Sequence, residues 1–398
     1  MLSKVAENLK PSPTLFLVAR AKELQAQGHP VISLTVGEPD WPTFPVPSQA
    51  GIEAIQKNIT KYTAASGSIE LRKVIAEKVK KDLGVPYAAN EITVGSGAKF
   101  IIFAALQMVL DPGDEVILHS PYWVSYPTMV ELAGGVPKIV FCDEKENYKM
   151  SAAQLEKAIT PKTKAFLFCS PSNPTGLMYS KEELKAFAEV LRKHPKIVIL
   201  SDDIYNSLVL DGSGIAPHLL HVAPEFKDRL VAINGGSKAY SMTGWRIGWA
   251  AGPQRLIQAM GDYQSQTTGA PSSIAQHALL AAIPNCDKDI KNVIELLQKR
   301  KALAIQEFKK IPEMKISQPD GAFYLWVNIK SFLGKKFKSQ EIKTDKDFAE
   351  ILLTQFFVAT VPGTECGNDG YLRLSFATSE ENMRAAVARI LDFTSSLS

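Results

Sequence analysis

The sequence has few cysteines, no long apolar run and almost no excess of either charge. Its four cysteines, Cys142, Cys169, Cys286 and Cys366, form no CxxC pair and have no histidine at ligand spacing. This pattern argues against a disulfide framework and against a metal site. The longest apolar stretch, residues 101–110, is about half of the roughly 20 residues that a membrane span needs. The N-terminus also lacks the apolar segment of a secretory signal, so we expect a cytoplasmic protein without a membrane partner.

Charge and composition exclude several further classes. Lys and Arg total 45 and Asp and Glu 41, and the two signs alternate along the chain, so no nucleic-acid partner is expected. Apolar residues at 45% and charged residues at 22% are typical of a globular chain. At about 150 residues per domain, 398 residues indicate two to three domains. There is no P-loop, HExxH or GxSxG motif.

Short apolar runs alternate with amphipathic segments in the middle of the chain. Such runs are typical of strands buried on both faces of a mostly parallel sheet. Between them, Ser180 and Glu183 form a capping box that opens a helix over residues 180–191. The pattern predicts an α/β domain with helices on both faces of the sheet. The expected strands are residues 91–94, 115–119, 138–142, 164–169, 196–201, 230–234 and 246–251.

The C-terminal part has a different pattern. One amphipathic helix over residues 287–308 precedes a mixture of short strands and helices. We therefore predict a three-layer α/β large domain followed by a smaller α+β domain. The expected division is an N-terminal arm packing on the small domain (1–45), a large domain (46–290) and a small C-terminal domain (291–398).

Four places in the sequence could carry chemistry, and each has a plain structural alternative. Residues 95–97, Gly-Ser-Gly, lie between a strand and a helix, where free N–H groups could bind a phosphate or simply form a turn. Lys238 follows the end of one apolar strand, and Arg246 stands at the start of the next. A lysine held in the interior loses its charge easily and becomes nucleophilic, and a buried lysine and arginine together imply a bound anion. Pairing with internal carboxylates would explain both residues equally well.

The other candidates also follow or lie within strands. Asp202 and Tyr205 follow a strand at the edge where open α/β sheets bind ligands, although Asp202 could be a helix cap. Asn173 lies in an Asn-Pro sequence, for which a plain turn is the default interpretation. Arg373, in the middle of an alternating strand, could clamp a carboxylate or face solvent.

Together these segments resemble the class I branch of the pyridoxal-phosphate-dependent aminotransferases of fold type I, most closely the bacterial aspartate aminotransferases. Nine matching stretches in order over the whole chain make coincidence implausible. The stretches are residues 37–40 (GEPD), 61–63 (KYT), 120–127 (SPYWVSYP), 172–176 (SNPTG), 201–205 (SDDIY), 237–248 (SK to TGWRIG), 319–324 (PDGAFY), 361–363 (VPG) and 373–379 (RLSFATS).

The resemblance implies a role in cofactor chemistry for five residues. Lys238 would bind pyridoxal 5'-phosphate covalently and then act as the base that moves the substrate α-proton. Asp202 would pair with the pyridine nitrogen. Tyr205 and Asn173 would hydrogen-bond the phenolic oxygen of the ring, and Trp123 would stack on the ring.

The resemblance also implies binding roles for the cofactor phosphate and the substrate. Arg246 would bind the phosphate together with the amides of Gly97 and Ala98 and possible help from Lys99. Arg373 would clamp the substrate α-carboxylate, with Gly37, Trp123 and Asn173 lining the same pocket. Tyr62 would reach the phosphate of a neighbouring subunit, which implies a homodimer with shared active sites. No metal is expected.

Two departures from the family pattern stand out. Asp203 replaces the usual Glu after the ring-pairing Asp and is expected to face away from the cofactor. Gly235 stands where many relatives have a phosphate-binding Ser.

An N-terminal segment, Pro11 to Ala19, is expected to close over the cleft with the C-terminal domain.

The expected reaction moves an amino group from L-aspartate, or a similar amino acid, to 2-oxoglutarate in two half-reactions. We expect Lys99 to recognise the distal carboxylate of the substrate, with a phosphate contact as the alternative. The open alternatives are aromatic amino acid, prephenate or alanine specificity, and a β-elimination on the same cofactor. A transcription regulator and an oxidoreductase are less favoured, because no DNA-binding module and no complete dinucleotide fingerprint are found.

Overall fold

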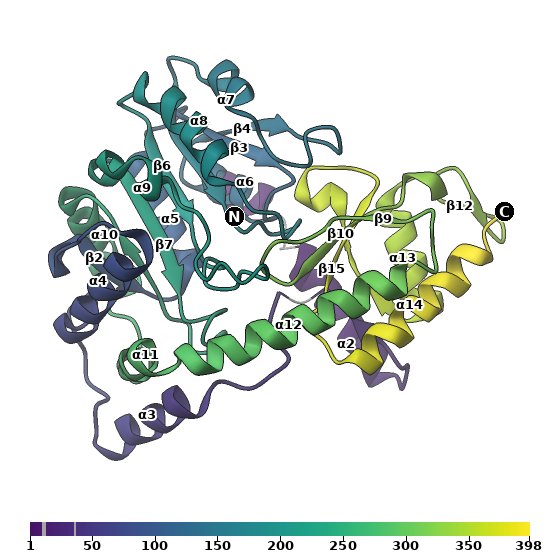
Figure 1. Cartoon of the computed structure of the whole chain (residues 1–398), viewed down its shortest axis with the longest axis horizontal. Coiled ribbons are helices and arrows are strands. Elements are labelled where there is room, and N and C mark those ends of the chain that lie inside the picture. The colour runs from purple at the N-terminus through teal and green to yellow at the C-terminus, as the bar shows by residue number, and fades with distance from the viewer. Residues whose placement is uncertain (10–12, 36) are drawn as a thin grey trace.

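The computed structural model describes residues 1–9, 13–35 and 37–398 of the chain. A seven-stranded sheet with its helices forms one part, and the C-terminal elements form a second, smaller part (Figure 1). The long helix α12 (Asp287–Phe308) runs from the sheet to the C-terminal elements. Within the described residues, no helix is long and apolar enough to cross a membrane.

All seven expected strands form the large sheet, and their ends differ from the prediction by at most two residues. The strands from β4 to β7 run parallel, whereas β8 is antiparallel to both of its neighbours. The prediction of a mostly parallel α/β sheet is confirmed. In sheet order the strands are β2 (Ile92–Gly95), β8 (Gly248–Ala251), β7 (Leu230–Gly235), β6 (Val198–Asp202), β5 (Thr163–Cys169), β3 (Glu115–Ser120) and β4 (Val136–Phe141).

Helices cover both faces of this sheet. Phe166 of β5 packs edge-on against Phe187 of α8, with ring centroids 5.7 Å apart. Cys169, an odd number of residues further along the same strand, points to the opposite face, where its partner in register is Asp202. The helices around the sheet are α3 (Pro45–Gln56), α4 (Ile69–Leu83), α5 (Ala98–Val109), α6 (Tyr126–Leu132), α7 (Ala152–Ala158), α8 (Lys181–Arg192), α9 (Leu219–Val222), α10 (Gln254–Gln266) and α11 (Ser273–Asn285).

The sequence explains where several of these helices begin and end. Ser180 caps α8 by accepting a hydrogen bond from the Glu183 N–H, and the Glu183 side chain accepts from the Ser180 N–H, as the predicted capping box requires. Gly84 ends α4 in the left-handed conformation that glycine adopts without strain.

The C-terminal part is an α+β unit around a four-stranded sheet. In sheet order its strands are β14 (Val361–Pro362), β15 (Tyr371–Ser375), β10 (Tyr324–Asn328) and β9 (Lys315–Ile316). The remaining elements are the hairpin β11 (Lys336–Phe337) and β12 (Gln340–Glu341), with α13 (Asp345–Phe356), β13 (Val358–Ala359) and α14 (Glu380–Ser395).

The N-terminal elements α1 (Lys4–Asn8), α2 (Pro13–Ala26) and β1 (Ile32–Ser33) precede the large sheet. β1 pairs in parallel with β13, and Ala21 and Leu24 of α2 share a small apolar core with Leu353 and Ala359. The arm therefore contacts the C-terminal part. The division into residues 1–45, 46–290 and 291–398 stays a prediction, and residue 290 lies inside α12.

Candidate active site

A cavity of about 540 Å³ lies at the carboxyl ends of β5, β6 and β7, next to the N-terminus of α5. In parallel sheets this is the edge at which ligands bind. The cavity brings together residues from both parts of the chain that the sequence had singled out. These residues are Gly37, Ala98, Lys99, Trp123, Asn173, Asp202, Tyr205, Lys238, Arg246 and Arg373.

Lys238 follows the end of β7, and its side chain reaches into this cavity. The Nζ group donates a hydrogen bond to the carbonyl oxygen of Gly37. Burial lowers the pKa of the Lys238 amine to about 8, because an ammonium group loses hydration there. About a tenth of this amine is therefore uncharged at pH 7, far more than for an ordinary lysine, and the uncharged form is the one that attacks a carbonyl carbon.

Asp202 is the last residue of β6 and is 4% exposed. Its Oδ2 accepts a hydrogen bond from the Tyr126 hydroxyl at 2.6 Å, and its Oδ1 accepts from the Ile204 N–H at 3.3 Å. Burial raises the pKa of the Asp202 carboxyl to about 6, so the group is mostly ionised at pH 7. A buried carboxylate in this position suits a cationic ring nitrogen.

Tyr205 meets a second tyrosine in the cavity. Its hydroxyl lies 2.7 Å from the hydroxyl of Tyr324, and burial raises the pKa of Tyr205 well above the ordinary value. Tyr205 therefore stays a protonated donor at neutral pH. A Cβ atom on Gly37 would lie 2.5 Å from the Tyr324 oxygen, so only glycine fits beside this pair.

The N-terminus of α5 lies at one end of the cavity and is free to bind an anion. Its N-cap, Gly97, supplies no side-chain hydrogen bond and has φ of +91°. A Cβ atom on Gly97 would lie 2.5 Å from Nη2 of Arg246, so the guanidinium packs directly on the glycine. Free N–H groups at a helix start and an adjacent cation suit a phosphate.

The prediction of a buried Arg246 is wrong, because the residue is exposed. It has φ of +53° and lies two residues before β8, where the chain turns towards the cavity mouth. Its Nη1 donates to the Thr243 carbonyl at 2.8 Å. The guanidinium is thus held over Gly97 without leaving solvent.

Arg373 lies deep at the other side of the cavity, with 2% of its surface exposed. Nη1 donates to Oδ1 of Asn173 at 3.0 Å and Nη2 to the Thr35 carbonyl at 2.6 Å. Its Nε has no hydrogen-bond partner, and within the described residues no carboxylate forms an ion pair with it. A buried cation without a counter-ion is costly, so this site is suited to an anionic ligand. The alternative of an Arg373 facing solvent is wrong.

Lys99 and Trp123 line the cavity together. The Lys99 Nζ lies 4.8 Å from the centroid of the Trp123 ring, a cation–π contact. Burial, and then the charge of Arg246, lower the pKa of Lys99. The Trp123 ring meets the Tyr126 ring edge-on at 5.4 Å.

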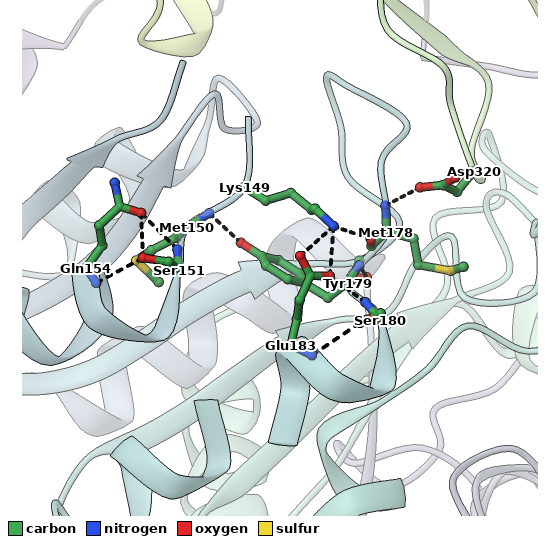
Figure 2. A network of polar contacts seen from close by, with 10 residues as sticks. Lys149, Met150, Ser151, Gln154, Met178, Tyr179, Ser180, Glu183 and Asp320 are labelled. Atoms are coloured by element: carbon green, nitrogen blue, oxygen red, sulfur yellow. Dashed lines mark hydrogen bonds and ion pairs between the residues drawn. The ribbon is translucent and has the colours of Figure 1, made fainter. Parts of the chain in front are cut away.

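The loop that carries Asn173 and the segment just before β10, the strand that carries Tyr324, are joined outside the cavity. The Lys149 ammonium donates to the Met178 carbonyl at 3.3 Å, and the Met178 N–H donates to Oδ2 of Asp320 at 3.0 Å (Figure 2). Asp320 precedes β10, whereas Met178 follows β5. These contacts therefore fix the C-terminal strand that carries Tyr324 against the loop that carries Asn173.

Three further predicted features lie outside the cavity or at its edge. Tyr62 is fully exposed and does not line the cavity. Asp203, which was expected to face away from the cofactor, does not line the cavity, and its Oδ1 accepts a hydrogen bond from the Ser201 hydroxyl. A Cβ atom on Gly235 would lie 2.9 Å from the Ile247 carbonyl oxygen, so a side chain at this position would require the backbone to shift.

The predicted closing segment, Pro11 to Ala19, lies partly outside the described residues. Val18 of α2 does line the cavity. That this segment closes over the cleft on ligand binding stays a prediction.

Sequence reasoning missed three side chains of the site. Tyr126 and Tyr324 lay inside the matching stretches, but no local pattern shows that their hydroxyls reach Asp202 and Tyr205. Ser237 lines the cavity next to Lys238 and could have been inferred from that adjacency.

Comparisons with known proteins identify the family. The family model described as aminotransferase class I and II matches residues 29–390. The chain is 44% identical over 398 residues to the aspartate/prephenate aminotransferase of Cereibacter sphaeroides, covering 100% of this chain and 99% of that protein. The crystal structure of the aspartate aminotransferase from Rhizobium meliloti superposes with a TM-score of 0.95 at 41% identity over 100% of both chains. The Thermus thermophilus aspartate aminotransferase with maleate superposes with a TM-score of 0.91 at 38% identity over 99% of both chains. The chain therefore belongs to the class I and II aminotransferases, with the fold type I architecture that the sequence motifs had indicated.

Proposed function

We propose that the cavity binds pyridoxal 5'-phosphate, the cofactor that the family implies, and that Lys238 holds it covalently. The residues present fit this group. The uncapped start of α5 and Arg246 suit its phosphate, and the buried carboxylate of Asp202 suits its ring nitrogen. The observation that carries the proposal is the buried amine of Lys238, with its lowered pKa, between these two ends.

The bound cofactor would supply an electron sink for the carbanion left when the substrate loses its α-proton. Asp202 would keep the ring nitrogen protonated, and Tyr126 would hold the Asp202 carboxylate in place. The Tyr205 hydroxyl would donate a hydrogen bond to the phenolic oxygen of the ring. The Oδ1 of Asn173 already accepts a hydrogen bond from Arg373, so the NH₂ group of Asn173 is left to donate to the phenolic oxygen of the ring.

The chain's own groups would also bind the substrate and move its proton. Arg373, whose Nε lacks a partner, would bind the α-carboxylate beside Gly37. The Lys238 amine, when not bound to the cofactor, would take the α-proton of the substrate at Nζ, because its lowered pKa suits a base near neutral pH. Trp123 would cover the ring and help to exclude water.

The reaction that we propose is amino transfer from L-aspartate to 2-oxoglutarate, in two half-reactions that use the same Arg373. Relatives named aspartate aminotransferase and aspartate/prephenate aminotransferase support this choice. Prephenate is the second candidate acceptor, because the relatives' names include it. Aromatic amino acids and alanine remain weaker alternatives.

Lys99 is the proposed contact for the distal carboxylate of aspartate. For the purified enzyme with 2-oxoglutarate, we expect aspartate to be the best donor in a panel of amino acids. Because a hydrogen bond to a charged group contributes about 1.5–3 kcal/mol, Lys99→Ala should lower kcat/KM for aspartate by roughly 10- to 150-fold. The value for alanine, which has no distal carboxylate, should change little.

Initial rates with the panel of amino acids test both the proposed reaction and the role of Lys99. If the wild-type enzyme transfers no amino group from any donor, the proposed function is wrong. If Lys99→Ala keeps the same preference for aspartate over alanine, the role of Lys99 is wrong and the function stands.

We also propose a cytoplasmic homodimer with shared sites. Tyr62 is fully exposed, and the apolar side chains of Ile52, Ile55 and Ile59 are also exposed on or near α3. In a dimer these side chains would be covered and Tyr62 could reach the partner's phosphate site. Sedimentation should give about twice the mass of the 398-residue chain. A monomer that retains full turnover would contradict the shared site.

A further inference from the structure

A buried polar cluster lies on the far side of the sheet, behind Asp202. Asp203 is 3% exposed and His218 is 4% exposed. Oδ1 of Asp203 accepts a hydrogen bond from the Ser201 hydroxyl at 2.6 Å, and Oδ2 lies 3.3 Å from Nε2 of His218. The Asp203 N–H donates to the Ile233 carbonyl at 2.7 Å and so extends the pairing of β6 with β7 past Asp202.

The hydrogen bonds assign a neutral tautomer to His218. Its Nδ1 accepts from the Leu220 N–H at 3.1 Å, which caps the short helix α9. An Nδ1 that accepts cannot carry a proton, so the proton of the ring is on Nε2, which lies 3.2 Å from the Ser201 hydroxyl oxygen and 3.3 Å from Oδ2 of Asp203. Asp203 therefore accepts a hydrogen bond from the Ser201 hydroxyl and lies beside the Nε2–H of a neutral His218, which also contacts the Ser201 oxygen. Neither residue supplies a cation.

The other titratable groups around Asp203 do not supply a free cation. The Nδ1 of His221 accepts from the His218 N–H, and its Nε2 faces the Asp82 carbonyl, so His221 is neutral too. Lys78 and Asp82, across a small neighbouring cavity, form an ion pair with each other at 2.7 Å. Tyr87, Cys169 and Asp202 complete the surrounding groups, and none of them is cationic.

The corner of the chain at Asp202 is thus anchored on both faces of the sheet. On one face Tyr126 and the Ile204 N–H hold Asp202. On the other face Ser201 and His218 hold Asp203. Because the two carboxylates belong to adjacent residues, the anchoring of Asp203 helps to fix the backbone that carries Asp202.

We propose that Asp203 and His218 form a positioning pair that aims the Asp202 carboxylate and adds a second buried negative charge behind it. The pair would strengthen the grip of Asp202 on the protonated ring nitrogen of the cofactor. This inference rests on the proposed role of Asp202 in cofactor binding. The charge of Asp203 also acts to raise the pKa of Asp202, the direction that favours sharing a proton with a ring nitrogen.

Two variants of His218 separate this role from helix capping. The Nε2 of Gln in His218→Gln can replace the donor that faces Ser201 and Asp203, but the side chain loses the acceptor for the Leu220 N–H. The Oδ1 of Asn in His218→Asn can keep that acceptor, but the side chain cannot reach Asp203. Each variant therefore keeps one of the two ring contacts of His218 and loses the other.

The measurement is the dissociation constant of pyridoxamine 5'-phosphate, which binds without a covalent link to Lys238, alongside the Tm of the cofactor-free protein. We expect His218→Asn to weaken binding by about tenfold, as the loss of a hydrogen bond to a buried charge implies. His218→Gln should bind within about threefold of wild type but melt at a lower temperature, because its helix cap is lost. Asp203→Asn should weaken binding at least as much as His218→Asn.

The outcomes distinguish the positioning role of Asp203 and His218 from the proposed role of Asp202 in cofactor binding. If affinity falls only in the variants that also lose Tm, the cluster is structural and the positioning role is wrong. If the wild-type protein does not bind the probe, or Asp202→Asn binds it as well as wild type, the proposed role of Asp202 fails instead.

Discussion

Replacing Lys238 by Ala should lower kcat for amino transfer by at least about 10⁴-fold, the upper range for loss of a general base. The amine would be lost both as the covalent anchor and as the group that carries the α-proton. Lys238→Arg should be equally inactive, because a guanidinium stays charged and cannot act as a base. Both variants should still bind the cofactor through the groups at its two ends.

Lys99 provides the control for this prediction. Within the described residues, Lys99 and Lys238 are the lysines that line the cavity, and burial lowers the pKa of both. Borohydride reduction and peptide mapping should find the cofactor on Lys238 in the wild-type protein and in Lys99→Ala. No reduced adduct should form in Lys238→Ala. An adduct on Lys99 in the wild-type protein would overturn the assignment.

The gathering of Asn173, Asp202 and Lys238 could be predicted from the sequence. Each follows one of three apolar runs, and parallel strands place their carboxyl ends at one edge of a sheet. Asp203 could be placed on the opposite face by alternation along the strand alone. Local pattern and topology rules were enough for these residues.

The partners of these residues could not be predicted in this way. Tyr126 is 76 positions from Asp202 and Tyr324 is 119 positions from Tyr205. Such contacts depend on how helices and the second domain pack, which no local period contains. The exposure of Arg246 was missed for a related reason, because the strand β8 begins two residues later than the apolar run suggested.

The second large effect concerns stability as well as turnover. The pKa of Asp202 is raised in the folded chain from 3.8 to about 6, mainly by burial. Because the folded value lies above the unfolded one, ionisation of Asp202 destabilises the protein. The penalty is absent below about pH 3, where the group is protonated in both states, and complete above about pH 7, where it amounts to about 3 kcal/mol.

Asp202→Asn should therefore stabilise the cofactor-free protein while it impairs the enzyme. We expect the free energy of unfolding in urea to rise by up to about 3 kcal/mol at pH 7 and to stay unchanged below about pH 3. At the same time kcat should fall by roughly 10²- to 10⁴-fold, because an amide cannot keep the ring nitrogen protonated.

Tyr126→Phe is the matched variant, because it removes the hydroxyl that donates to Asp202 at 2.6 Å and leaves the charge unpaired. It should lower the stability of the cofactor-free protein at pH 7 by about 1–3 kcal/mol. In the Asp202→Asn background the same change should cost less, since no charge is left unpaired. Equal costs in both backgrounds, or a pH-independent gain from Asp202→Asn, would show that Asp202 is not a buried anion. A stabilising Asp202→Asn that also lost turnover would mean that the fold tolerates a costly charge because the cofactor needs it.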